Sequence, residues 1–367
     1  MRVRLIIDAV NRHWIIGKIT ERLAGHLADH GVEADIDEGP SSSADVNHWM
    51  LYLQPWRHYY AAPGFYNQGW KPAPPTIHTA TVTHVDDPLK VQILRDSVGK
   101  ILHAGICMSR MTMEELTGYG IDASRLTWIN PGHDAAVQPR RIVIGMTTRL
   151  YGDGRKREGD LLQVARTIRL DAFRFDIAGE GWEEVAEVLR SAGAEVELLP
   201  GLPYDAILER LRQFDYYLYM GWDEGSMGTI DALAAGVKTI VTPQGFHLDL
   251  NGGITHPFHD AEELTAVFRS IAADRQTLLD SVRELTWPEY ARKHALVWRA
   301  LLEGRLLSDV MSMGGEPIAS GDVADSRRRA RSRLFKSEFW PYYIESRKFW
   351  LRGRASRFKR WLLRRNT

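Results

Sequence analysis

The stretch DYYLYMGWDEGSMGTIDALAAGVKTIVTP, residues 215–243, joins two short apolar runs through a glycine-containing turn and a helical segment. The runs DYYLYMG and VKTIVTP have the length and the aromatic or β-branched content of buried strands. Between them, residues 228–235 form a short helical pattern of small and apolar residues. A strand, a helix and a strand in this order predict a parallel sheet covered by helices.

The same alternation continues along the chain in both directions. A linker around residues 134–140 divides two such series, and residues 54–75, rich in aromatic residues, Gly and Pro, predict an irregular loop. We therefore expect an α/β chain of two Rossmann-like domains facing across a cleft. Further strands are expected at 2–9, 76–84, 105–109, 141–148, 173–179 and 194–201, and further helices at 17–30, 88–103, 112–119, 159–169, 182–192, 204–214 and, with a break near Trp287, 262–303.

Composition restricts the class of protein. The 367 residues suit two domains, and contents of 44% hydrophobic and 26% charged residues are typical of a soluble globular protein. Cys107 is the only cysteine, so no intramolecular disulfide can form, which fits a reducing cytosol. Residues 1–10 contain only a short apolar run, and no apolar run reaches about 18 residues. We expect neither a signal peptide nor a membrane span.

The C-terminal end of the sequence is strongly basic. Residues 326–367 contain 15 of the 47 Lys and Arg but only 2 of the 47 Asp and Glu, so this tail carries +13 and the rest of the chain −13. Within 349–367, apolar residues follow helical spacing and most Arg and Lys lie elsewhere, which predicts an amphipathic helix on an anionic membrane surface. The alternatives are a solvated tail, or a tail that docks on the acidic body or on a partner protein.

Two acidic residues, Asp223 and Asp231, stand eight positions apart at the expected start of the helix. Gly225 and Gly228 would let the backbone approach a ligand closely. The helix start would direct free N–H groups and the positive end of its dipole at a diphosphate, and Asp231 could accept hydrogen bonds from ribose hydroxyls. The alternative is a helix N-terminus with acidic caps and a small-residue packing face.

Residues 223–245 resemble the donor-site motif of retaining GT-B glycosyltransferases of the family-4 kind (glycosyl transferases group 1). In that motif an acid, seven residues and a second acid precede a small-residue helix that ends in Gly. The family usually has Glu at both acidic positions, and Phe-Gly where this chain has Ser226-Met227-Gly228. Either Asp223 or Glu224 can be the first acid, which by this resemblance holds hydroxyls of the donor sugar.

Residues 145–162, GMTTRLYGDGRKREGDLL, resemble a second segment of the same family, which supplies an Arg and a Lys to the donor diphosphate. Arg149 takes the Arg position, and the Lys position falls on Arg157, or on Lys156 if the loop is one residue longer. Two cations at a strand end suit a pyrophosphate, which gains negative charge as the glycosidic bond breaks. A solvated basic loop is the alternative for this segment taken alone.

Two looser matches lie in the first half of the chain. Gly17 follows the first expected strand, where the family has a glycine-containing loop that could approach a phosphate or the acceptor. His84 stands at a strand end, where the family often has a histidine facing the transferred sugar. An ordinary buried or surface histidine is the alternative for His84.

The resemblance implies a retaining, metal-independent hexosyl-type transferase with a UDP- or GDP-linked sugar as co-substrate and no cofactor. The expected acceptor is a hydroxyl of a lipid-linked glycan or polysaccharide intermediate. The catalytic candidates are His84, Arg149, Arg157 and Asp223, and the donor-binding candidates are Gly17, Lys156, Glu224, Gly225, Ser226, Met227, Gly228 and Asp231.

The expected organisation is an acceptor domain at 1–138, a nucleotide-sugar domain at 139–285, a helix at 286–305 that packs back toward the N-terminal domain, a linker at 306–325 and the basic tail at 326–367. We expect a cytoplasmic protein, peripheral at the inner face of the cell membrane, with proteins of a glycan assembly pathway as candidate partners. A nucleotide-sugar epimerase and a non-catalytic sugar-nucleotide-binding scaffold are alternatives. Nucleic acid is not an expected partner, because the body is acidic and no RNA or DNA motif occurs.

Overall fold

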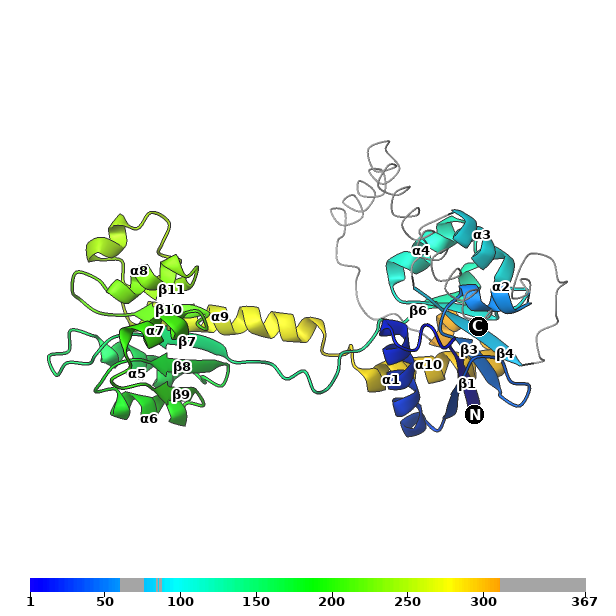
Figure 1. Ribbon diagram of the computed structural model, residues 1–367, viewed down its shortest axis with the longest axis horizontal. Coiled ribbons are helices and arrows are strands. Elements are labelled where there is room, and N and C mark those ends of the chain that lie inside the picture. The colour runs from blue at the N-terminus through cyan, green and yellow to red at the C-terminus, as the bar shows by residue number, and fades with distance from the viewer. Residues whose placement is uncertain (60–75, 84, 86–87, 311–367) are drawn as a thin grey trace, which may run out of the picture. The chain divides into compact units, whose positions relative to one another are not determined.

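The computed structural model describes residues 1–59, 76–83, 85 and 88–310, which form two six-stranded sheets (Figure 1). The strand order is β2-β1-β3-β4-β5-β6 in the first sheet and β12-β11-β10-β7-β8-β9 in the second, and all neighbouring strands run parallel. Helices occur between the strands of both series. The predicted α/β class with two Rossmann-like sheets is confirmed.

The first half contains three strands, β2, β3 and β6, and one helix, α2, that the sequence patterns do not predict. β2 has the polar sequence EADID and lies at an edge of its sheet, where it needs no apolar face on both sides. α2 occupies the start of the expected irregular loop 54–75, whose remainder lies outside the described residues, and β6 is only three residues long. The elements of this half are β1 (Arg2–Ile6), α1 (Ile15–Leu27), η1 (Ala28–His30), β2 (Glu33–Asp37), β3 (Val46–Trp49), α2 (Leu53–Tyr59), β4 (Ile77–Val82), α3 (Pro88–Ser97), β5 (Ala104–Cys107), α4 (Arg110–Gly118), η2 (Ala123–Arg125) and β6 (Leu126–Trp128).

The second half follows the predicted alternation closely. Its core is a continuous buried cluster in which Phe173, Phe175 and Phe268 pack ring against ring between β8 and α9. The elements are β7 (Ile142–Met146), α5 (Glu158–Thr167), β8 (Phe173–Ile177), α6 (Glu183–Ser191), β9 (Glu195–Leu198), α7 (Tyr204–Leu211), β10 (Tyr216–Tyr219), α8 (Met227–Ala234), β11 (Lys238–Val241), η3 (Gly245–Asp249), β12 (His256–Pro257) and α9 (Ala261–Ser281).

The chain then returns to the first sheet through α10 (Trp287–Leu302). Thr286 caps this helix by accepting a hydrogen bond from the Glu289 N–H, and Pro288 lies in its first turn, which explains the break that the sequence predicts there. The buried face of α10 shares a hydrophobic cluster with α1 and β1. Packed structure continues into α11 (Leu307–Val310), inside the range expected as a linker, because Leu307 is buried in the same cluster.

None of the helices within the described residues is both long and apolar enough to cross a bilayer. The basic tail at 326–367 lies outside those residues, as does most of the linker at 306–325. The membrane prediction for the tail therefore stays a prediction from sequence.

Candidate functional site

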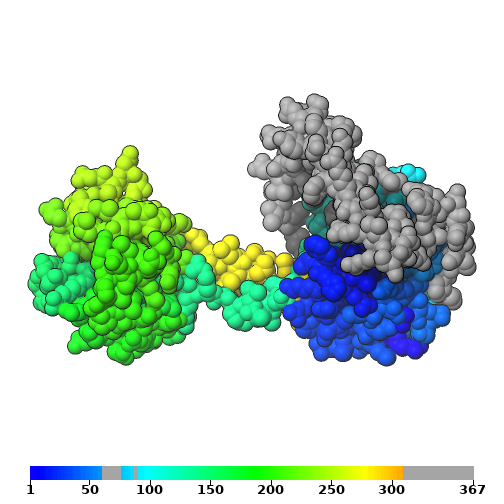
Figure 2. Space-filling view, in the orientation of Figure 1, coloured from blue at the N-terminus to red at the C-terminus, as the bar shows by residue number. Residues whose placement is uncertain are grey.

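The second sheet has a topological switch point between β7 and β10. From β7 the chain adds β8 and β9 on one side, and it then places β10 on the other side of β7. In open parallel sheets, ligands bind beyond the carboxyl ends of the strands at such a point. The loops that follow β7 and β10 contain residues 147–157 and 220–226, which include most of the donor-site candidates. Figure 2 shows the segment around residues 220–250, in yellow-green, at the surface of this half.

Two polar side chains from these loops, Lys156 and Asp223, meet that of Tyr219 at the end of β10. Lys156 Nζ lies 2.6 Å from Asp223 Oδ2 and donates to Tyr219 Oη at 2.9 Å. Tyr219 in turn donates to the other carboxylate oxygen of Asp223. Lys156 is only 9% exposed, whereas the Asp223 side chain is one-third exposed. The Lys156 ammonium group is therefore buried, whereas the Asp223 carboxylate is partly exposed to solvent.

Electrostatics keep Asp223 ionised and Tyr219 protonated. Burial acts to raise the pKa of Asp223, but hydrogen bonds from Lys156 and Tyr219 outweigh it, so the pKa lies below its ordinary value. Burial, and then the neighbouring carboxylate, raise the pKa of the Tyr219 hydroxyl. The cluster thus holds a carboxylate that accepts hydrogen bonds, together with an ammonium group and a phenol that donate them.

The loop that carries Asp223 is held by side chains of the segment that follows β11. Gln244 donates its side-chain amide to the carbonyls of Gly221 and Asp223, the latter at 2.8 Å, and Thr242 Oγ1 donates to the Gly221 carbonyl at 3.0 Å. The Trp222 N–H donates to the Arg155 carbonyl at 2.9 Å, which ties this loop to the loop after β7. Asp223 is therefore positioned by backbone contacts on both sides.

The amino end of α8 is held by a buried histidine. The Ser226 N–H donates to His247 Nε2 at 3.0 Å, and His247 Nδ1 lies 3.1 Å from the Thr242 carbonyl. Because a backbone N–H only donates and a carbonyl only accepts, the ring proton is on Nδ1 and Nε2 is the acceptor. Ser226 Oγ also bonds Tyr217 Oη at 2.8 Å, so the first helix residues are anchored on the sheet.

The two glycines of the motif serve the fold of this turn. Gly225 has φ +118°, a left-handed conformation that disfavours any side chain. A Cβ on Gly228 would lie 2.1 Å from Thr147 Oγ1 and 2.3 Å from Tyr217 Oη. Gly228 therefore allows α8 to pack closely against Thr147, which follows β7, and against Tyr217 in β10.

The two candidates for the lysine position differ in where their side chains lie. Lys156 contacts Asp223, whereas Arg157 turns away and pairs with Asp160 at 2.5 Å and with the His259 carbonyl at 2.7 Å. The Arg157 side chain is 8% exposed. The structure therefore brings Lys156, and not Arg157, to Asp223, one of the two candidates for the first acid of the motif.

Arg149 stays near the surface beside this cluster. Its guanidinium pairs with Glu180 at 3.1 Å, and its side chain is 62% exposed. It is one of three cations around the ring of Tyr151, at 5.9 Å for Arg149, 3.9 Å for Arg155 and 6.0 Å for Lys156. A basic patch thus lies beyond the end of β7.

The remaining candidates are distributed more widely. Asp231 lies in the second turn of α8, and its carboxylate accepts a hydrogen bond from Tyr204 Oη at 2.9 Å. Glu224 and Met227 are exposed. Gly17 lies in α1 of the first half, where a Cβ would meet the Arg12 carbonyl oxygen at 1.9 Å, so its close contact is with its own loop. His84 lies outside the described residues.

Several residues of the site carry no motif signal. Tyr219, Gln244 and His247 reach the Asp223 loop from two other segments, and only the folded chain brings them there. Arg155 and Tyr151 lie within the basic segment that the sequence marks, but neither stands at a family position. The sequence signal for Tyr219 is its place near the end of the apolar run 215–221, just before the expected turn.

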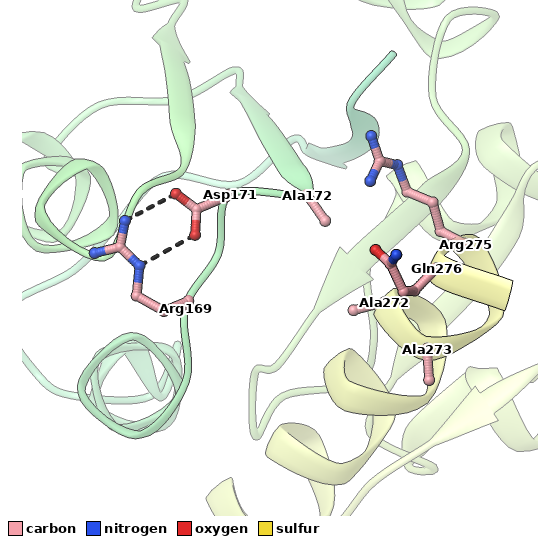
Figure 3. Close-up of a pocket in the computed structure, with 7 residues that line it drawn as sticks. All are labelled: Arg169, Asp171, Ala172, Ala272, Ala273, Arg275 and Gln276. Carbon is pink, nitrogen blue, oxygen red and sulfur yellow. Dashed lines mark hydrogen bonds and ion pairs between the residues drawn. The ribbon is translucent and has the colours of Figure 1, made fainter. Parts of the chain in front are cut away.

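A separate open hollow of about 420 Å³ lies at the opposite, amino end of β8 (Figure 3). It is bordered by the segment before β8 and by α9, and its Arg169 is already paired with Asp171 at 2.8 Å. Its position at the amino ends of the strands separates it from the switch point. The lining residues are Arg169, Asp171, Ala172, Ala272, Ala273, Arg275 and Gln276.

No protein-family model matches the chain, and no curated protein sequence matches it. Among solved structures, HepE from Anabaena in complex with UDP and glucose is 12% identical over 80% of this chain and 94% of that chain, with a TM-score of 0.29. A glycosyltransferase from Rickettsia africae is 13% identical over 82% and 98%, with a TM-score of 0.32. Sucrose-phosphate synthase from Thermosynechococcus elongatus is 11% identical over 83% and 100%, with a TM-score of 0.34.

Proposed function

We propose that the chain is a GT-B-type glycosyltransferase that moves a sugar from a nucleotide diphosphate to a hydroxyl acceptor. The observation that carries the proposal is the Lys156–Asp223 pair, 2.6 Å apart, at the switch point of the second sheet. A diphosphate placed there meets the ammonium group, and sugar hydroxyls meet a carboxylate kept ionised by its neighbours. Both parts of a nucleotide sugar thus have a matching group.

These residues would act electrostatically, by stabilising charge on the leaving diphosphate. The acceptor oxygen forms a bond to the anomeric carbon, the bond from that carbon to the diphosphate oxygen breaks with its electron pair on the leaving group, and the acceptor proton passes to solvent. Lys156, together with Arg149 and Arg155 of the basic patch, stabilises the negative charge that grows on the diphosphate. Retention at the anomeric carbon, a hexose donor, metal independence and an action of His84 on the transferred sugar belong to the same proposal, and they rest on the family resemblance of the sequence.

The test is a thermal-shift panel of UDP- and GDP-linked sugars, followed by product analysis with the best donor. Ligand binding to the folded chain raises its melting temperature, and we expect a rise for at least one nucleotide sugar. The Lys156→Ala variant should lose that rise. The matched control is Arg169→Ala, which removes an exposed cation at the other end of the sheet. Altered donor sugar with no acceptor present would instead identify an epimerase, and binding without turnover would identify a scaffold.

We also propose that the basic tail, residues 326–367, holds the enzyme at an anionic membrane, where a lipid-linked acceptor would be found. The support is its net charge of +13 together with its aromatic residues. Co-sedimentation with anionic and neutral liposomes tests this, comparing the full chain with a chain ending at Asp325. Binding of the shortened chain equal to that of the full chain would leave docking on a partner protein as the explanation of the tail.

A further inference from the structure

Trp222 is an exposed aromatic residue directly before Asp223. Its residue surface is 66% exposed, although a tryptophan normally gains free energy from burial. Its backbone is nevertheless fixed, because its N–H donates to the Arg155 carbonyl at 2.9 Å and Gln244 holds the carbonyls on either side. The indole is therefore an exposed apolar surface on an ordered loop, available for contact with a ligand.

The Trp222 ring is supported by a cation. The Arg157 guanidinium carbon lies 4.4 Å from the ring centroid, which is a cation–π geometry. Arg157 itself cannot move freely, since Asp160 and the His259 carbonyl hold its guanidinium and its side chain is 8% exposed. The indole therefore rests on a buried, doubly tethered group.

The backbone at Arg157 is unusual in a way that serves this arrangement. Among the residues that the structure describes, Arg157 is the one non-glycine residue with a positive φ, at 54°. Left-handed backbone at a bulky residue is unfavourable and persists where the surrounding structure fixes it, often at functional sites. Here it turns Arg157 under Trp222 while its neighbour Lys156 turns to Asp223.

We propose that Trp222 is a stacking platform for the pyranose ring of the nucleotide sugar, which makes it a specificity-determining residue. A pyranose has apolar C–H faces and hydroxyls around its edge, so it matches a flat apolar surface beside a hydrogen-bonding carboxylate. Trp222 and Asp223 are consecutive and provide these two features. The inference rests on the proposed function, and it assigns the donor sugar, rather than the base or the acceptor, to this ring.

The test measures how much the sugar adds to nucleotide binding. Isothermal titration of the full chain and of Trp222→Ala, each with UDP, UDP-glucose, GDP and GDP-mannose, gives the ratio of Kd between each diphosphate and its sugar form. We expect Trp222→Ala to raise the Kd of the tighter-binding sugar nucleotide about tenfold, equivalent to about 1.4 kcal/mol. The Kd of the matching diphosphate should change by less than about twofold. Trp222→Phe should keep most of the affinity that the sugar adds to the diphosphate.

A matched control removes an equally exposed apolar residue elsewhere. Leu278 on α9 is 71% exposed, and Leu278→Ala should leave every Kd unchanged. Three results for Trp222→Ala would overturn its assignment while leaving the proposed function intact. They are an equal loss of affinity for diphosphate and sugar nucleotide, no loss of affinity for either, and a change only in the KM for acceptor. Failure of the native chain to bind any nucleotide or nucleotide sugar would reject the proposed function, and the inference with it.

Discussion

The imidazole rings of His48 and His294 lie 5.4 Å apart, edge to face, and both side chains are fully buried between β3 and α10. His48 bonds Thr79 Oγ1 at 2.8 Å and Thr81 Oγ1 at 2.9 Å, and His294 Nδ1 bonds the Tyr290 carbonyl. The pair therefore joins the returning helix to the first sheet through neutral groups. Protonation of either imidazole is disfavoured there, because burial lowers the pKa of both.

We predict that this histidine pair makes the fold sensitive to acid. Burial lowers the pKa of His294 from 6.5 to about 4, and burial followed by the neighbouring His294 lowers the pKa of His48 well below 6.5. The unfolded chain binds these protons first, so their contribution to stability is complete above pH 6.5 and is lost as the pH falls toward 4. The loss amounts to about 1.4 kcal/mol per pH unit and per histidine.

Urea unfolding midpoints between pH 4.5 and 7.5 measure this slope. His294→Leu should flatten it, even though the variant is less stable overall. The exposed His259 provides the control, since His259→Leu should keep the native slope. An unchanged slope in His294→Leu would assign the acid sensitivity to other groups.

The first acid of the donor motif should be Asp223. Asp223→Ala removes the carboxylate that Lys156 and Tyr219 hold, and we expect turnover to fall about 100-fold or more, as for other groups that organise developing charge. Glu224→Ala removes an exposed neighbour and should retain most activity. Steady-state kinetics of both variants, with circular dichroism to check folding, decide between them; a greater loss in Glu224→Ala would move the motif by one residue.

The strand, turn and helix of residues 215–243 could be predicted, because unbroken apolar runs are typical of buried strands such as β10 and β11. β2 could not, because EADID is polar and an edge strand draws its stability from pairing with β1 rather than from burial. In the site, spacing marked residues 156–157 and 223–224 but could not choose within each pair. The side chains of consecutive loop residues can diverge, as those of Lys156 and Arg157 do, and where each lies depends on backbone angles such as the left-handed φ of Arg157.

We predict that Arg157 stabilises the fold of the donor-side loop. Arg157→Ala leaves Asp160 without its ion-pair partner and removes the hydrogen bond to the His259 carbonyl, at an expected loss of about 1–3 kcal/mol in the free energy of unfolding. Arg155→Ala, at an exposed neighbouring position, should change stability by less than about 0.5 kcal/mol. Thermal melts of both variants without ligand provide the comparison, and equal melting temperatures would contradict this assignment.

The glycine at the start of α8 should not tolerate a side chain. A Cβ at Gly228 would stand 2.1 Å from Thr147 Oγ1 and 2.3 Å from Tyr217 Oη, and Tyr217 is fully buried, so the helix would have to move away from the sheet. We expect Gly228→Ala to lower the free energy of unfolding by about 1–3 kcal/mol, the usual effect of overpacking. Because the same movement displaces the loop that carries Asp223, nucleotide-sugar binding should weaken further than the stability loss alone requires.

Gly159 offers a matched control for this substitution. It also lies in the first turn of a helix, α5, but a Cβ there meets nothing within 4 Å. Gly159→Ala should therefore be neutral or stabilising by up to about 1 kcal/mol, since alanine favours the helix over glycine. Urea unfolding and donor titration of the two variants separate the effects. Equal behaviour of Gly228→Ala and Gly159→Ala would show that α8 does not depend on its contact with Thr147 and Tyr217.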